Sequence, residues 1–201
     1  MVVRFWKIKE KLFPKNFFYR HSKLVAPDLI GCYLIKKNNE IDKVKGVIVE
    51  TEAYSQEEEA CHGHRRKTES NKPLFGKPGT FYIYKSYGIH HCLNIVTDKE
   101  NFASGVLIRA VFISNKNERL ASGPGLVTKA FELDISFNSL DVLNNKSLWI
   151  SQRAHNIEEK DLIQTTRIGI SKAKNIKWRW YLKNSRSVSK RLKGDRTPNF
   201  K

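Results

Sequence analysis

The chain has 201 residues with no break in composition, which is enough for one globular domain with a sizeable core. Its 37 Lys and Arg side chains against 20 acids give a formal net charge of +17, so a phosphate backbone is the expected partner. Three cysteines argue against a disulfide framework, and no apolar run approaches the ~20 residues of a membrane span, so we expect a cytoplasmic protein without a membrane segment.

The first predicted elements are a helix and a strand. Residues 20–31 have the pattern of a short helix that serves packing, with Ser22 at its N-cap position. A strand is predicted at Cys32–Lys36, and the polar turn at Asn38–Lys43 leads from it into a second strand.

The second strand carries the most informative pattern in the chain. A period of two divides its residues between two faces, with Val47, Val49, Thr51 and Ala53 on one and Ile48, Glu50, Glu52 and Tyr54 on the other. We expect the first face to be core and the second to be a functional site. Five of the twenty acids also fall within ten positions here: Glu50, Glu52, Glu57, Glu58 and Glu59. In a strongly basic protein, such a cluster indicates that carboxylates do chemistry.

A long polar connection and a hairpin follow. Residues 55–79 are charged and contain few apolar side chains, and long ordered loops in compact domains are usually functional. Phe81–Tyr84 and Ile89–Val96 are aromatic and branched enough to be strands. The four residues 85–88 between them have the length and the glycine of a hairpin connection. Tyr87 is therefore expected at a hairpin tip.

The remaining elements complete a sheet with few helices. A strand is predicted at Val106–Ile113 with Arg109 in its middle, and residues 122–133 have the pattern of a helix that begins near a proline. Short strands are expected around Ser147–Ile150 and Trp178–Leu182. The sum is an α/β (α+β) fold, predicted as a single domain over the whole chain with a basic tail from about residue 190.

Alternation places the expected chemistry around one carboxylate. Glu52 and Tyr54 share a face, as do Tyr82 and Tyr84, so a carboxylate lies beside phenol rings. A partly apolar pocket raises the pKa of such a carboxylate, which can then deprotonate a water near neutral pH. Arg109 is the natural group to keep it charged and oriented. The alternative for Glu52 alone is a half-exposed strand carboxylate paired with a lysine.

Tyr87 is interpreted differently from the other tyrosines. Aromatic residues in strands are more often core than ligand platform. A large ring beside Gly88 in a tight turn has little core to enter, however, so an exposed wedge is expected. Proteins that act on a base inside a duplex commonly fill the gap left by the extruded base with such a side chain.

Two short stretches suggest a different class of site, because their residue types can bind zinc: Cys61, His62 and His64, and then His90, His91 and Cys92. No CxxC pair is present, and on a strand His91 points away from its two neighbours, so satisfied structural histidines are the competing interpretation. No P-loop and no GxGxxG motif is present, which argues against nucleotide-dependent catalysis.

An ordered set of motifs resembles a known family. The set is VETEAY (49–54), EACH (59–62), KPGTFYIYKSYGIHHCLNIV (77–96), VLIRAV (106–111), SGPG (122–125), RIGI (167–170), WRWYLKNS (178–185) and VS (188–189). Together these motifs resemble the 3-methyladenine, or alkyladenine, DNA glycosylases. The resemblance implies a curved antiparallel sheet with flanking helices and a protruding hairpin. It also implies a monofunctional enzyme that excises alkylated purines, and often hypoxanthine or ethenoadenine, from double-stranded DNA without a metal or cofactor. Monomeric action on DNA is the simplest expectation.

The resemblance also implies roles for single residues. Glu52 matches the general base, and Arg109 matches the residue that helps to position the attacked water. Tyr54, His62 and Tyr84 match the side chains that stack on and bond the extruded base, and Asn94 matches the residue that crowds the amino group of guanine. Tyr87 matches the residue inserted into the minor groove.

The chain departs from the family pattern at three places. Leu126 stands where the family usually has Lys or Arg, Ser70 replaces an expected Arg, and Leu74 replaces a common Met. These changes bear on DNA affinity and substrate range. Three hypotheses stay open on the residues alone: a monofunctional glycosylase, a metal-dependent nuclease that uses the Cys and His residues, and a non-catalytic nucleic-acid-binding protein.

Overall fold

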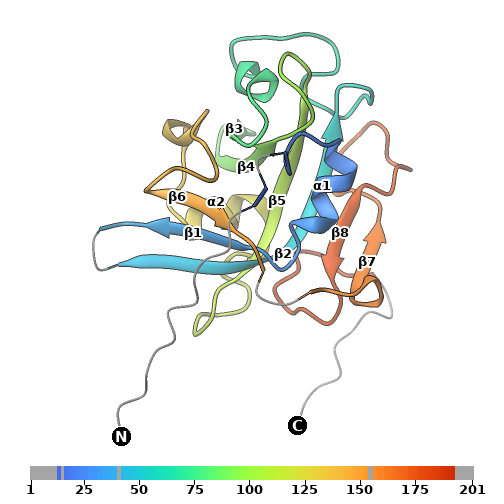
Figure 1. Cartoon of the computed structure of the whole chain (residues 1–201). Coiled ribbons are helices and arrows are strands. Elements are labelled where there is room, and N and C mark those ends of the chain that lie inside the picture. The colour runs from blue at the N-terminus through green and yellow to red at the C-terminus, as the bar shows by residue number, and fades with distance from the viewer. Residues whose placement is uncertain (1–12, 15, 40–41, 154–155, 193–201) are drawn as a thin grey trace, which may run out of the picture.

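One long strand organises the sheet. The computed structural model describes residues 13–14, 16–39, 42–153 and 156–192 (Figure 1). Within these residues eight antiparallel strands pair in the order β3-β4-β5-β2-β1-β6, and β8 joins β2 with β7 outside it. The strands are β1 (Tyr33–Lys37), β2 (Lys43–Ser55), β3 (Phe81–Ser86), β4 (His90–Val96), β5 (Ser104–Phe112), β6 (Leu148–Ser151), β7 (Leu162–Thr165) and β8 (Arg179–Leu182). The predicted mixed fold around a curved antiparallel sheet is confirmed.

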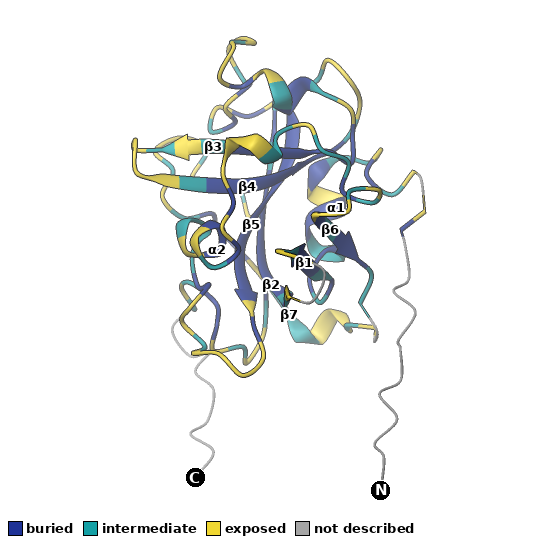
Figure 2. Cartoon of the chain, turned by 90° about the vertical axis from the view of Figure 1, so that its left-hand side faces the viewer, coloured by how far each residue is buried: buried dark blue, intermediate teal, exposed yellow. Residues whose placement is uncertain are grey.

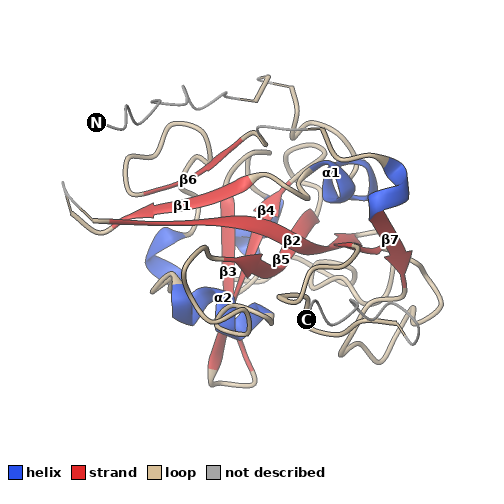
Figure 3. Ribbon diagram, turned by 90° about the horizontal axis from the view of Figure 1, so that it is seen from below, coloured by secondary structure: helices blue, strands red, loops and turns tan. Residues whose placement is uncertain are grey.

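Helices are few and short. They are α1 (Ser22–Asp28), α2 (Pro124–Ala130) and the 3₁₀ turns η1 (Lys72–Phe75), η2 (Ile135–Phe137) and η3 (Glu159–Asp161). Figure 3 shows the curl of the sheet, with β3 and β4 running across the direction of β1 and β2. None of the helices described is long and apolar enough to cross a bilayer.

The basic tail predicted from about residue 190 lies almost entirely outside the described residues.

The strand β2 is buried along most of its length, and its predicted alternation is only partly right. Ile48 was expected on the face of the glutamates, but it packs in the main core, whereas Val49 packs against Tyr181. The register against β5 shifts between Ile48 and Glu50, which marks a β-bulge. Because a bulge inserts one extra residue, the alternation changes phase there. From Glu50 onward the two faces are as predicted.

The helix α1 packs onto β2 through polar as well as apolar contacts. The hydroxyl of Ser22 donates to the carbonyl of Tyr54 at 2.9 Å, and the hydroxyl of Thr51 donates to the carbonyl of Ala26 at 2.8 Å. The predicted N-cap was wrong by one residue, because the cap is His21, whose Nδ1 accepts from the N–H of Lys23 at 3.1 Å. Ser22 thereby ties the helix to the strand that carries the glutamates.

The hairpin of β3 and β4 projects from the body of the molecule. Figure 2 shows its strands changing from buried to exposed towards the tip. Tyr87 and Gly88 have φ values of 49° and 69°, as a primed hairpin turn requires. The outer edge of β3 is covered by Asn138, whose side chain accepts from Ile83 N–H at 2.6 Å and donates to Ile83 C=O at 3.1 Å. This pairing stabilises an edge strand without a further strand beside it.

The second helix and one strand differ from the prediction. The second helix ends at Ala130 rather than near Leu133, because Glu132 takes a positive φ of 50° that a right-handed helix excludes. The strand β7 was missed, since it has only four residues and their burial follows no clear period of two.

Candidate active site

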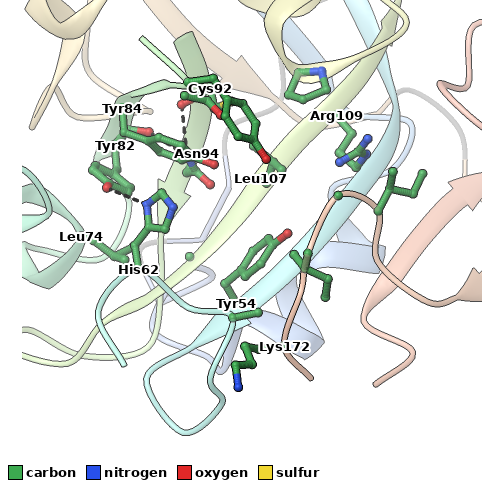
Figure 4. A pocket seen from close by; sticks show the side chains of 18 of the residues that line it. Tyr54, His62, Leu74, Tyr82, Tyr84, Cys92, Asn94, Leu107, Arg109 and Lys172 are labelled. Atoms are coloured by element: carbon green, nitrogen blue, oxygen red, sulfur yellow. Dashed lines mark hydrogen bonds between the residues drawn. The ribbon is translucent and has the colours of Figure 1, made fainter. Parts of the chain in front are cut away.

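A cavity of about 570 Å³ opens between the β3–β4 hairpin, the ends of β2 and β5, and the loop 168–172 (Figure 4). Its lining includes six residues that the sequence singles out: Tyr54, His62, Tyr84, Tyr87, Asn94 and Arg109. They come from five different segments of the chain. The curled sheet therefore brings together residues that are far apart in sequence, and a 570 Å³ cavity is of the size that binds small organic groups.

The seventh predicted residue, Glu52, lies directly behind the cavity wall. Its side chain is fully buried. Its Oε2 accepts a hydrogen bond from the hydroxyl of Tyr54 at 2.8 Å and another from Nη1 of Arg109 at 3.3 Å, and both of these residues line the cavity. The backbone N–H of Ile168 donates to Oε1 at 2.8 Å. Since each carboxylate oxygen accepts about two hydrogen bonds, Oε1 keeps one acceptor position.

Burial and hydrogen bonds act on this carboxylate in opposite directions. Burial raises the pKa of Glu52 above its ordinary value, because desolvation disfavours the charged form. The charge of Arg109, the N–H of Ile168 and the hydroxyl of Tyr54 oppose that rise. The balance leaves an acid whose pKa is raised, a property of groups that accept a proton near neutral pH.

The neighbouring acid, Glu50, is buried and held by four hydrogen bonds. It accepts from Arg179 Nε at 2.6 Å, from Ser189 N–H at 2.7 Å, from Ser189 Oγ at 2.9 Å and from Arg109 Nε at 3.3 Å. Arg109 thus bridges Glu50 and Glu52 with two different nitrogens. Glu50 fixes the arginine that contacts Glu52, and three of its four hydrogen bonds fall on Oε1.

The opposite wall of the cavity is aromatic. The rings of His62 and Tyr84 meet edge-on with centroids 4.1 Å apart, and those of Tyr82 and Tyr84 are 5.6 Å apart. His62 Nδ1 and Tyr82 Oη share a hydrogen bond of 3.3 Å. Burial lowers the pKa of His62, so its ring is neutral at physiological pH. A neutral ring has one donor and one acceptor nitrogen and can bond an uncharged edge of a flat ligand.

Asn94 adds a fixed amide to the same wall. Its Nδ2 donates to the carbonyls of Tyr82 at 3.2 Å and Cys92 at 3.1 Å. The amide orientation is the one that satisfies these bonds. Both donors are used within the hairpin, so the side-chain carbonyl is the polar atom that Asn94 offers to the cavity it lines.

Tyr87 lies at the rim of this cavity, and its side chain is 89% exposed. Ile89, just beyond the turn, is also largely exposed. Two large apolar side chains on a projecting tip have no core to enter. Exposed apolar residues gathered at one place mark contact sites more often than chance exposure does.

The acidic cluster divides into buried and exposed members. Glu50, Glu52 and Glu58 are buried, whereas Glu57 and Glu59 are exposed. Glu58 forms a two-pronged ion pair with Arg167, at 2.7 Å to Nη1 and 2.8 Å to Nη2. Sequence analysis assigned no function to this ion pair or to the Ile168 N–H. Arg167 and Ile168 both belong to the RIGI motif, which the sequence singled out.

The loop before η1 supports His62 from behind. The side chain of Asn71 donates to the carbonyls of His62 at 2.8 Å and Arg66 at 3.0 Å and accepts from the N–H of Thr68 at 2.7 Å. Ser70, one of the departures from the family pattern, shares a hydrogen bond with Thr68 at 3.1 Å. Asn71 therefore fixes the backbone that carries a ring of the cavity wall.

The Cys and His residues are placed for packing and for the cavity. Burial raises the pKa of the Cys61 thiol to about 11 and also raises that of Cys92, so both thiols are neutral. In the part of the chain that the structure describes, no three His, Cys, Asp or Glu side chains group closely enough to hold a metal ion.

The sequence of the chain is similar to proteins of one family over most of its length. A family model described as methylpurine-DNA glycosylase matches residues 16–186. A protein of Trichodesmium erythraeum is 40% identical over 188 residues, covering 85% of this chain and 94% of the relative. A protein of Carboxydothermus hydrogenoformans is 41% identical over 192 residues, covering 90% of this chain and all of the relative. The provisional name of both relatives is 3-methyladenine DNA glycosylase.

Proposed function

The chain belongs to the methylpurine-DNA glycosylase family, and we propose that it removes alkylated purines from duplex DNA with Glu52 as the base that activates water. Family membership makes it a DNA glycosylase, an enzyme of DNA repair that hydrolyses N-glycosyl bonds. The proposal concerns the lesion, the extrusion of the base and the residues that act.

The observation that carries the proposal is the position of the Glu52 carboxylate. It is buried, its pKa is raised, and Oε1 keeps one acceptor position directly behind the wall of the cavity. A water in that position would donate to Oε1 and face the cavity. Because Glu52 has no exposed surface, the proposed reaction requires the wall of Tyr54, Arg109 and Ile168 to open when the nucleotide and its water enter.

The reaction then needs few groups. The water loses a proton to Glu52 as its oxygen attacks C1′ of the extruded nucleotide, and the bond from C1′ to the purine nitrogen breaks with its electrons staying on the base. A cationic purine such as 3-methyladenine or 7-methylguanine leaves as a neutral molecule. Protonation by an acid therefore matters mainly for neutral bases such as hypoxanthine. The negative charge of Glu52 also stabilises the positive charge that develops on the sugar.

The aromatic wall suits a cationic base. Tyrosine faces attract cations with about 0.5–2 kcal/mol each, and Tyr54 and Tyr84 line the same cavity. Neutral His62 can bond the edge of the base. The fixed amide of Asn94 crowds the exocyclic amino group of guanine, which lowers affinity for the undamaged base.

Extrusion of the base requires a group to fill the gap in the duplex. Unstacking a base costs a few kcal/mol, least for a damaged one. Tyr87 at the exposed tip of the hairpin fills that gap from the minor groove. The net charge of +17 supplies the attraction to the phosphates on either side.

The test is base release from defined duplexes. Purified protein is incubated in excess over duplexes that each carry one lesion, with and without a chelator. We expect release of 3-methyladenine and 7-methylguanine, unaffected by the chelator, from strands that stay intact until alkali cleaves the abasic site. Chelator-sensitive strand cleavage would favour the nuclease, and lesion binding without release from any substrate would favour a binding protein.

A further inference from the structure

Arg167 of the RIGI segment forms a buried ion pair with Glu58 that the reaction above does not use. Arg167 is 6% exposed, and its guanidinium forms the two-pronged pair with Glu58. Its Nη1 also donates to the carbonyl of Ala53 at 3.0 Å. Burying two charges costs several kcal/mol per ion, so a buried pair is weak evidence of a stabilising role. The residues that Arg167 adjoins, Tyr54 and Ile168, point to a different role for the pair.

The first neighbour is Tyr54. The guanidinium carbon of Arg167 lies 4.7 Å from the centroid of the Tyr54 ring. Its bond to Ala53 also holds the strand residue directly before this tyrosine. Arg167 therefore restrains Tyr54 through both backbone and ring. Tyr54 is the residue whose hydroxyl donates to Glu52 Oε2.

The second neighbour is Ile168, the next residue in the chain. Its N–H donates to Glu52 Oε1, and it begins the loop 168–172 that lines the cavity. A loop of this kind has no strand to hold its amide in place. The ion pair with Glu58 holds Arg167, the residue directly before Ile168, and so fixes the direction in which the Ile168 N–H points towards Glu52.

We propose that Arg167 is a positioning residue that aligns two of the three donors to the Glu52 carboxylate, the Tyr54 hydroxyl and the Ile168 N–H. The proposal rests on the function proposed above. Arg167 does not touch the carboxylate and acts only through these two residues. Its guanidinium and the Glu58 carboxylate form a rigid, planar contact that lysine does not reproduce.

The inference predicts a change in pH dependence. Glu52 works as a base in its charged form, and hydrogen bonds to that form lower the pKa of a carboxyl group. Loosening two donors therefore raises the pKa of Glu52. The acid limb of the pH–rate profile, where the rate of base release falls as Glu52 becomes protonated, then moves to higher pH. The other groups around Glu52 are Arg109, Glu50, Arg179, Tyr84 and Cys92, and they stay in place in the variants below.

The experiment measures single-turnover release of 7-methylguanine from pH 5.5 to 9 for wild type, Arg167→Lys and Glu58→Asp. Both variants keep the buried charge and lose the two-pronged geometry. We expect the acid limb to move up by about one pH unit, which lowers the rate about tenfold well below both pKa values. Arg153→Lys is the matched control. Arg153 Nη1 bonds to the carbonyl of Ile30 at 2.9 Å away from the cavity, so this variant loses stability without moving the limb.

Each outcome has a separate meaning. If the wild type releases no base, the proposed function fails and Arg167 has no reaction to serve. If the wild type is active and both variants keep the wild-type limb, even with a lower maximum rate, Arg167 is only structural and the inference is overturned. Thermal melting shows whether Arg167→Lys folds, and Glu58→Asp decides the question if it does not.

Discussion

The hydroxyl of Tyr54 donates a 2.8 Å hydrogen bond to Oε2 of Glu52, two residues earlier on the same strand. The strand period of two puts both side chains on one face. Tyr54 lines the cavity whereas Glu52 lies behind it. The tyrosine therefore connects the cavity surface to the buried carboxylate that we propose as the base.

Replacing the carboxylate should separate binding from catalysis. In Glu52→Gln the side chain keeps its size but can no longer take a proton, so base release should fall by at least about 100-fold while the affinity for a lesion duplex stays within a few-fold of wild type. Single-turnover release and duplex binding measure the two effects. Glu57→Gln, at an exposed acid of the same cluster, is the control and should leave both unchanged. Equal release by Glu52→Gln would refute the assigned role.

The same variant should change stability in a pH-dependent way. The folded-state pKa of Glu52 is raised above 4.5, so the stability due to this group is present below about pH 4.5 and is lost as the pH rises through the folded value. Glu52→Gln removes that loss. We expect its melting temperature to gain on wild type as the pH rises from 4.5 to 8. A constant difference across this range would contradict the raised pKa.

Removing only the hydroxyl of Tyr54 should weaken the base without emptying the pocket. In Tyr54→Phe the ring stays, and Glu52 loses one of three donors. Hydrogen bonds to charged groups contribute about 1.5–3 kcal/mol, so the acid limb of the pH–rate profile of base release should move up by about one to two pH units. A pH series of single-turnover rates measures the shift. Tyr82→Phe, whose hydroxyl bonds His62 rather than Glu52, should leave the limb in place.

The hairpin tip should matter for DNA and not for folding. In Tyr87→Ala the fold loses only a side chain that is 89% exposed, so the melting temperature should not fall. Stacking of an aromatic side chain on bases contributes about 1–3 kcal/mol, which predicts lesion binding weaker by roughly 5- to 150-fold. Tyr19→Ala, at another exposed tyrosine, is the control. Unchanged lesion affinity in Tyr87→Ala would count against insertion of this ring.

The parts predicted well from sequence depend on local patterns. The hairpin follows from two β-rich runs around a short turn with glycine, and the shared face of Glu52 and Tyr54 follows from strand alternation alone. The bulge near Val49 was missed because one extra residue leaves no local composition signal. Ile48 was therefore assigned to the wrong face.

Long-range pairing explains most of what remained hidden. Glu58 and Arg167 are 109 residues apart, and Glu50 and Ser189 are 139 apart. No periodicity or motif spacing relates such positions, so the sequence showed an acidic cluster without showing which members are neutralised. The Ile168 N–H is a backbone group and has no residue type to mark it. Its role becomes visible only once the loop 168–172 is placed against β2.

The left-handed backbone conformation of Tyr87 lowers the stability of the fold while it holds the ring at the exposed tip of the hairpin. A bulky residue at φ 49° costs roughly 1–2 kcal/mol compared with glycine, and this ring recovers little of that through packing because it is 89% exposed. A laboratory selection for heat resistance alone should therefore favour Asn or Gly at this position. Such a variant would be more stable but would lack the ring that we propose to enter the duplex, so thermostable variants of this enzyme are best screened for base release as well.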